Sequence, residues 1–185
     1  MKISWVLANS TSFDPEVDLD QLKNIGSFWG GWRTWRGCHT DNVICNETKK
    51  AAELVRRAFH AVCNLYVPRS VYDSLERPAG VKVFEGEFDH DVDDHDNIVA
   101  MHLAATVSDI VLLYGFDFTE QPKNSDKLAE HKSHNYRGLT KQVILDNPTI
   151  QWVAVDHSGD FRKDLLTVAN LSKDSMQSVI ELLGH

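Results

Sequence analysis

The sequence predicts an α/β fold with a mostly parallel sheet and helices on both faces. Two features carry this prediction. Short apolar runs of strand length alternate along the chain with longer segments of helical periodicity. One of these runs, Ile110–Tyr114, is unbroken in apolar residues, as expected of a strand that is covered on both faces. It stops at Gly115, and the carboxylate of Asp117 follows directly. We therefore expect Asp117 at the mouth of a ligand site beyond the strand end, with a turn aspartate as the alternative.

The other elements follow in order from the same reasoning. Strands are predicted at residues 3–8, 40–44, 65–67, 81–84 and 150–155. Helices are predicted at residues 17–24, 47–63, 97–107 and from 138 or 140 to 146, with a short helix or turn at 71–75. Asn46 is expected to cap the helix at 47–63, and Ser172 or Asp174 to cap a final helix. We predict one Rossmann-like domain over residues 1–185.

Composition narrows the classes of protein. The chain has 185 residues, of which 42% are hydrophobic and 25% charged, and its formal net charge is −8. A broad basic face for duplex nucleic acid is therefore not expected. The first residues lack the longer apolar core of a secretory signal, so none is expected, and no later apolar run reaches membrane-spanning length. The three cysteines form no Cys-x-x-Cys pair. A cytoplasmic protein with reduced thiols is the expectation, or one of the host cytoplasm if the chain is phage-encoded.

Two segments carry candidate binding residues. The polar residues Asn9, Ser10, Thr11 and Ser12 follow the first predicted strand and could direct N–H groups and hydroxyls at a phosphate, or could form a simple turn. Residues 26–37 hold Trp29, Trp32 and Trp35 together with Arg33 and Arg36. Such residues could stack on a base or sugar and bind a phosphate. The alternative is that the tryptophans close the core or form the interface of a homo-oligomer.

Residues 85–96 contain seven acidic residues and two histidines. One hypothesis is a metal site that also uses His102, and a metal-dependent phosphohydrolase built on residues 89–102 would follow from it. A solvated acidic loop that caps the next helix is the interpretation we prefer, because acidic side chains suit a helix start. No metal is therefore assigned.

A family resemblance adds to these patterns. The predicted helix and strand that end in Gly115-Phe116-Asp117-Phe118, followed later by Ser133-His134-Asn135-Tyr136, resemble bacterial sialyltransferases of the Campylobacter type and the related archaeal pterin-diphosphokinase-like proteins. The amino-terminal strand, its polar loop and Phe13-Asp14-Pro15 look similar as well. In this chain Ala8 and Ser10 stand where that family's phosphate loop has glycines. The density of tryptophan also resembles uncharacterised proteins of marine tailed phages.

The resemblance implies a nucleotide-dependent transferase of the glycosyltransferase type. His134 would be the general base, Asp117 would close the nucleotide pocket, and residues 9–12 would lie near the donor phosphate. No cofactor is implied, because the nucleotide-activated donor is itself the substrate, and a nucleotide-linked small molecule is the expected partner. The remaining candidate ligand-binding residues are Trp32, Arg33, Asn97, Tyr136 and Arg137. The main alternative is a non-catalytic phage accessory or virion protein on a degenerate scaffold.

Overall fold

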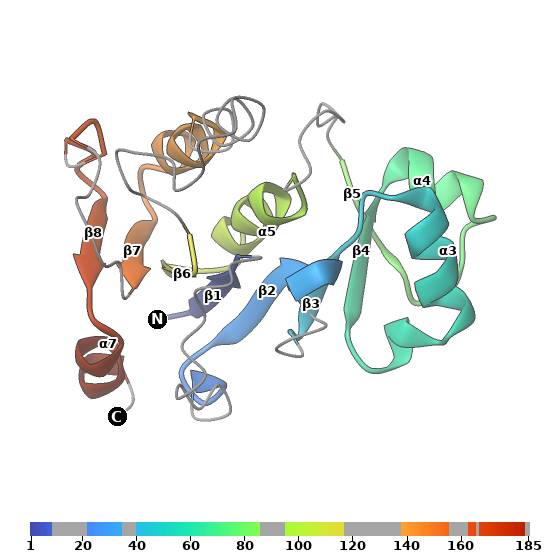
Figure 1. The fold of residues 1–185 in the computed structure, drawn as a ribbon, viewed down its shortest axis with the longest axis horizontal. Coiled ribbons are helices and arrows are strands. Elements are labelled where there is room, and N and C mark those ends of the chain that lie inside the picture. Colours follow the sequence, from blue (N-terminus) through green and yellow to red (C-terminus); the bar gives the residue numbers. More distant parts are fainter. Residues whose placement is uncertain are drawn as a thin grey trace, which may run out of the picture.

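The computed structural model describes residues 1–8, 22–34, 40–85, 95–116, 138–155, 163–165 and 167–183. These residues form one eight-stranded sheet in which all neighbouring strands run parallel, with helices on both faces (Figure 1). The predicted α/β class is confirmed, and the architecture is Rossmann-like. That residues 1–185 form a single domain stays a prediction.

The sheet has the strand order β5-β4-β3-β2-β1-β6-β7-β8. Its strands are β1 (Ile3–Leu7), β2 (Ser27–Gly31), β3 (Asn42–Ile44), β4 (Asn64–Pro68), β5 (Lys82–Phe84), β6 (Ile110–Tyr114), β7 (Gln151–Val155) and β8 (Leu171–Asp174). The helices are α3 (Thr48–Arg56), α4 (Arg69–Ser74), α5 (His95–Ala105) and α7 (Met176–Leu183), with a 3-10 helix η1 (Phe59–Ala61) and a further helix over residues 138–146.

Alternate residues of the central strands enter different cores. In β1, Trp5 and Leu7 pack in a cluster with Met176 and Val179 of α7, whereas Val6 joins the cluster that contains most of α5. A third cluster lies between the β3–β4 pair and helices α3 and α4. This alternation is what a strand with period two produces when both faces of the sheet are covered. The resulting three layers bury the central strands on both faces, and a ligand site is expected beyond their carboxyl ends.

The segment with the tryptophans contains a strand that the sequence analysis missed. Residues 27–31 form β2, between β1 and β3 in the sheet. Trp29 is buried, and its indole N–H is 3.1 Å from the Ser4 hydroxyl oxygen and 3.2 Å from that of Ser27. Its ring also packs beside Tyr66, with 5.4 Å between the ring centroids. Trp29 therefore serves the core, as one of the two interpretations held, while a homo-oligomer through this segment stays a prediction.

Three further local predictions are wrong. Ser172 and Asp174 belong to β8, and the hydroxyl of Ser175 accepts the N–H of Ser178 at 3.1 Å at the start of α7. Asn46 does not cap α3, whose N-cap residue is Glu47 without a side-chain hydrogen bond. The long helix predicted over residues 47–63 ends at Arg56, because Ala58 adopts a left-handed conformation with φ of 54° before η1 begins.

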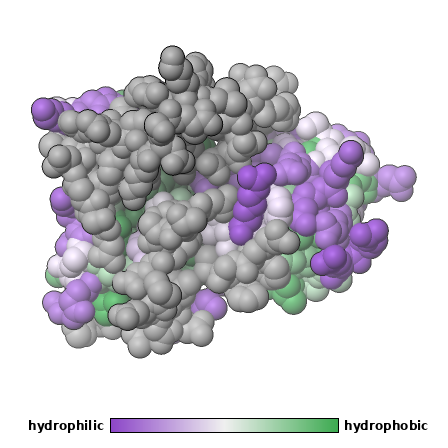
Figure 2. Space-filling model, viewed as in Figure 1, coloured by the Kyte–Doolittle hydropathy of each residue, from purple (hydrophilic) through white to green (hydrophobic). Residues whose placement is uncertain are grey.

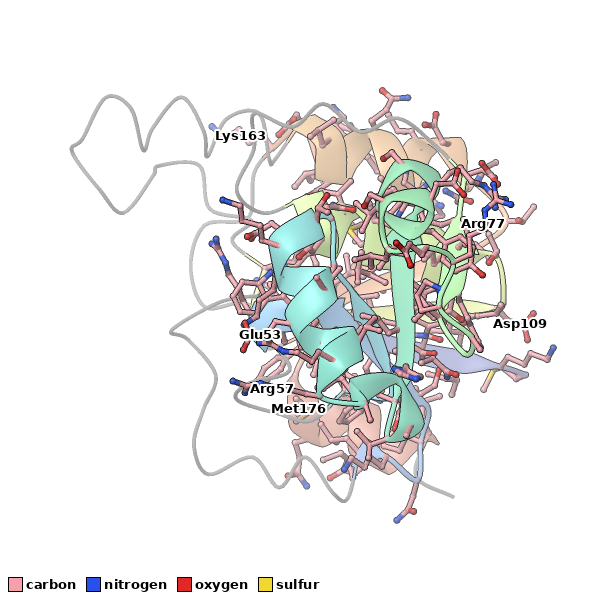
Figure 3. All side chains as sticks on the ribbon, turned by 90° about the vertical axis from the view of Figure 1, so that its right-hand side faces the viewer. Glu53, Arg57, Arg77, Asp109, Lys163 and Met176 are labelled. Atoms are coloured by element: carbon pink, nitrogen blue, oxygen red, sulfur yellow. The ribbon has the colours of Figure 1, made fainter. Side chains whose placement is uncertain are left out.

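Helix α3 is amphipathic, as its sequence predicts. Ala51 and Leu54 are buried against β3 and β4, and the hydrophilic surface over α3 gathers at the right of Figure 2. Figure 3 views the molecule from that side, with Glu53 and Arg57 on the outer face of the helix. Their charged groups are 2.9 Å apart, at an exposed i, i+4 spacing that contributes only a few tenths of a kcal/mol. Among the residues that the structure describes, no helix is long and apolar enough to cross a membrane.

Candidate functional site

The strands that follow β1 and β6 in the sequence lie on opposite sides of this central pair. β1 leads to β2 on one side of this central pair, and β6 leads to β7 on the other. The two strands stay paired to their ends, where Leu7 lies opposite Tyr114 and the N–H of Ala8 donates to the Tyr114 carbonyl at 3.0 Å. In open parallel sheets, ligands bind beyond the carboxyl ends of the strands at such a reversal. The β1–β6 junction is therefore the candidate site.

Gly115 ends β6 with φ of 77°, a left-handed conformation that glycine adopts without steric cost. Phe116 follows, and its side chain is buried in the cluster that contains α5. Asp117 is the next residue in the sequence and lies outside the described residues. The structure thus fixes the strand end that precedes this candidate acid.

The end of β2, beside this junction, needs its two glycines for close packing. A Cβ atom on Gly30 would lie 3.2 Å from the Leu7 carbonyl oxygen and from the Thr34 side chain. A Cβ atom on Gly31 would lie 2.8 Å from the Cβ of Asp96, closer than real Cβ contacts come. The Thr34 hydroxyl also donates to the Leu7 carbonyl at 3.3 Å. The absence of side chains here allows α5 to approach the strand end.

The first turn of α5 binds the ends of β2 and β3 through two side chains. The N–H of Gly31 donates to Asn97 Oδ1 at 3.1 Å, and the N–H of Asn46 donates to Asp96 Oδ1 at 3.1 Å. Both bonds satisfy backbone donors just where the ladder between strands ends. They join residues 66 and 50 positions apart in the chain, so that α5 and the two strand ends are held as one unit.

The two amides at this place are only partly hydrogen-bonded. Asn97 is 1% exposed, yet its Nδ2 has no hydrogen-bond partner among the described residues. The buried Oδ1 of Asn46 has no partner there either. Burying a polar group without a partner costs about 1–3 kcal/mol, so such atoms are uncommon unless something else binds them. One donor and one acceptor are thus left over at the ends of β2 and β3.

Trp32 lies one residue beyond β2, and two positively charged side chains lie over its ring. Lys50 Nζ is 4.6 Å from the ring centroid, and the guanidinium carbon of Arg33 is 5.6 Å from it. Trp32 also packs against the cluster under β3 and β4. Arg33 is 3.7 Å from Glu47, an exposed pair. The structure therefore brings the predicted residues Trp32 and Arg33 together near the site. The Trp32 ring lies between the cationic groups of Lys50 and Arg33 and the apolar residues under β3 and β4.

The two described cysteines are not set up as nucleophiles. Burial, followed by the charge of Asp96, raises the pKa of the Cys45 thiol to about 12. Burial also raises the pKa of Cys63 to about 12, with a smaller contribution from Asp41. Because the thiolate is the reactive form, both side chains are protonated and unreactive at neutral pH.

Few residues of the hypothetical metal site lie in the described part of the structure. Residues 86–94 lie outside the described part, and within that part no three His, Cys, Asp or Glu side chains come together as ligands. His102 is on α5, five residues beyond Asn97, where burial lowers its pKa and the charge of Asp146 opposes that shift. His102 is thus a partly buried residue beside the helix over residues 138–146.

The structure describes three of the eleven predicted site residues. Trp32, Arg33 and Asn97 all lie near the carboxyl ends of β2 and β3. The others are outside the described residues: Asn9, Ser10, Thr11, Ser12, Asp117, His134, Tyr136 and Arg137. The sequence analysis did not assign binding roles to Asn46 or Asp96. Asn46 follows a predicted strand, and the rule that selected Asp117 could have selected it too.

Comparison with known proteins does not assign this chain to a family. No family model, no curated protein and no solved structure matches this chain. The resemblance to sialyltransferases of the Campylobacter type therefore stays a prediction.

Proposed function

We propose that this chain is a nucleotide-dependent transferase of the glycosyltransferase type, which moves a group from a nucleotide-activated donor to a hydroxyl acceptor. The observation that supports it best is the reversal of strand order between β1 and β6. The polar residues 9–12 follow β1 in the sequence, and Asp117 follows β6 after Gly115 and Phe116. A phosphate of the donor would bind to the N–H groups and hydroxyls of residues 9–12.

The proposed reaction needs a base and a means of holding the leaving group. His134 would accept the proton of the acceptor hydroxyl, since an imidazole titrates near neutral pH. The acceptor oxygen would attack the donor carbon, and the bond from that carbon to the phosphate oxygen would break. The nucleotide would leave with both electrons of that bond. Arg33, near the end of β2, and Arg137 are the candidates to balance its charge.

The test is a thermal-shift panel with CMP, UDP, GDP and ADP, each with and without Mn²⁺. A nucleotide present at one hundred times its dissociation constant stabilises the folded protein by about 2.7 kcal/mol. We expect at least one nucleotide to raise the melting temperature. Arg77→Ala is the control for loss of an arginine, because the exposed Arg77 lies between α4 and the edge strand β5, away from the β1–β6 junction, and pairs only at the surface with Asp73 of α4.

A second measurement addresses catalysis. His134→Ala should abolish release of the nucleotide from CMP- or UDP-linked sugars while the shift with the free nucleotide persists. If none of the four nucleotides shifts the melting temperature, the transferase proposal fails, and the non-catalytic alternative becomes the better explanation. Stabilisation by Mn²⁺ alone would instead favour the phosphohydrolase hypothesis.

A further inference from the structure

Two cationic side chains lie over one aromatic ring just beyond the carboxyl end of β2. Lys50 Nζ is 4.6 Å from the Trp32 ring centroid and the Arg33 guanidinium carbon is 5.6 Å from it, both close enough for cation–π attraction. Lys50 Nζ also bonds to Glu53 Oε2 at 2.7 Å, and the Lys50 side chain is only 20% exposed. The ring and the carboxylate therefore hold this ammonium group in place, although the sequence analysis did not single out Lys50.

Both cations keep hydrogen-bonding capacity for an anion. The bond to Glu53 uses one of the three N–H donors of the Lys50 ammonium group. Glu53 also pairs with Arg57, at 2.9 Å, so its charge is shared between two cations. Arg33 lies 3.7 Å from the Glu47 carboxylate, a separation longer than a hydrogen bond, so that contact leaves its N–H groups able to bind a phosphate.

The turn that carries Arg33 is attached to the end of β1. Residues 32–34 form a helical turn directly after β2, and the hydroxyl of Thr34 donates to the Leu7 carbonyl at 3.3 Å. Leu7 is the last residue of β1, and the proposed phosphate-binding residues 9–12 follow it in the sequence after Ala8. Arg33 is therefore one residue from the contact between this turn and the strand end, with Lys50 over the adjoining ring.

From this arrangement we infer that the donor is linked through a nucleoside diphosphate, not a nucleoside monophosphate, and that Arg33 and Lys50 bind its second phosphate. This inference rests on the proposed function, because it assigns the class of the donor nucleotide. A diphosphate leaves with more negative charge than a monophosphate. Residues 9–12 are uncharged, so the added charge requires cations, and Arg33 and Lys50 supply two of them beside the strand end.

The same arrangement gives Trp32 a different role from base stacking. Lys50 and Arg33 lie over the ring, and apolar residues under β3 and β4 pack against it. Trp32 is thus a positioning residue, which orients the two cations toward the phosphate. If instead its ring stacked on the base, loss of the ring would weaken mono- and diphosphates alike, so the two roles have different experimental signatures.

The experiment compares the pairs CMP and CDP, UMP and UDP, GMP and GDP, and AMP and ADP. Calorimetry gives the dissociation constants at one ionic strength, with EDTA present so that metal ions bound by the diphosphates do not contribute. Lys50→Met removes the charge and keeps an unbranched side chain over the Trp32 ring. Lys49→Met is the matched control, because it removes the same charge from an exposed position in the same turn of α3. Trp32→Leu removes the ring, and circular dichroism of each variant shows that it is folded.

We expect the diphosphate to bind the unaltered protein about tenfold more tightly than the monophosphate, the combined effect of two partly exposed cations. In Lys50→Met and in Trp32→Leu this preference should fall to about threefold, whereas Lys49→Met should keep it.

Three results would overturn the inference while nucleotide binding stands. The first is equal binding of mono- and diphosphates by the unaltered protein. The second is a preference that survives in Lys50→Met, or that falls as far in Lys49→Met. The third is a Trp32→Leu variant that binds both nucleotides of a pair more weakly by the same factor. If no nucleotide of either kind binds, the proposed function itself has failed and the inference falls with it.

Discussion

Asn170 and Asn97 are side-chain amides at opposite edges of the sheet, and they differ in how fully they are hydrogen-bonded. At the amino edge, Asn170 Nδ2 lies 3.3, 3.0 and 3.0 Å from the carbonyl oxygens of Ile144, Asn147 and Ile150. At the carboxyl edge, Asn97 Nδ2 has no partner among the described residues. The Asn170 amide joins the end of the helix over residues 138–146 to the start of β7, which is a structural role. The second leaves a donor without a partner among the described residues at the carboxyl edge, the edge where open parallel sheets bind ligands in general.

Other polar groups extend this comparison. Near the amino ends of the strands, Asp41 accepts the N–H of Phe28 at 2.8 Å, and Asp109 accepts that of Lys2 at 2.7 Å. The buried hydroxyl of Thr40 is an exception, since it has no partner in the described part of the chain. Asp41 and Asp109 thus close the ends of the ladder, although the Trp152 indole N–H near the start of β7 also has no partner in the described part, while at the carboxyl edge one atom each of Asn46 and Asn97 has none there. The difference shows that side-chain amides close the amino edge more completely than the carboxyl edge.

The largest expected effect is the loss of stability when a glycine at the amino edge of the sheet is replaced by alanine, compared with the same change at the carboxyl edge. A Cβ atom on Gly26, at the amino end of β2, would lie 2.4 Å from the Ile3 carbonyl oxygen, which is backbone and cannot move without disturbing β1. We expect Gly26→Ala to lower the free energy of unfolding by about 3 kcal/mol, at the upper end for overpacked sites. Chemical denaturation measures the loss. Gly31→Ala is the comparison: its nearest contact is the Asp96 side chain, so about 1–2 kcal/mol is expected, and a larger loss there would reverse the ranking.

A second prediction tests the two amides directly. Asn170→Ala should lower the free energy of unfolding by about 2 kcal/mol, because the three carbonyl oxygens lose their donor. Asn97→Leu should cost less, about 1 kcal/mol or below, since the unpaired Gly31 N–H is offset by removal of a buried amide donor that had no partner. Urea denaturation of both variants gives the two values. Equal losses would mean that Asn97 is used as fully as Asn170.

The smallest effect concerns His102, on α5 beyond the site. Burial lowers the pKa of His102 below its ordinary value of 6.5, while the charge of Asp146 acts in the opposite direction. The unfolded chain therefore binds the proton more readily, so the stability contribution is complete above about pH 6.5 and is lost as the pH falls through the lowered pKa. We expect His102→Gln to flatten the dependence of the melting temperature on pH in that range.

His60→Gln is the control for this pH series, because His60 lies in η1, on a different element from His102. The two profiles should differ below pH 6.5 and coincide above it. A His102→Gln profile that keeps the full slope would show that another group is responsible.

The amino-acid sequence by itself determined the class of the fold. Ile110–Tyr114 is apolar throughout and α5 is rich in small and apolar residues, so local pattern was sufficient to predict a buried strand and the helix before it. The same pattern located the strand end that precedes Asp117. Such features are readable because they depend on residues that are neighbours in the chain.

Only the tertiary structure decided the rest. β2 contains two glycines and reads as a poor strand, but β1 and β3 pair with it on both sides. β8 is an edge strand in which no residue is buried, so its sequence lacks the apolar pattern of a covered strand. The contacts of Gly31 with Asn97 and of Asn46 with Asp96 join distant residues and depend on the strand order. No local pattern encodes them, because they arise only when the sheet and α5 have packed together.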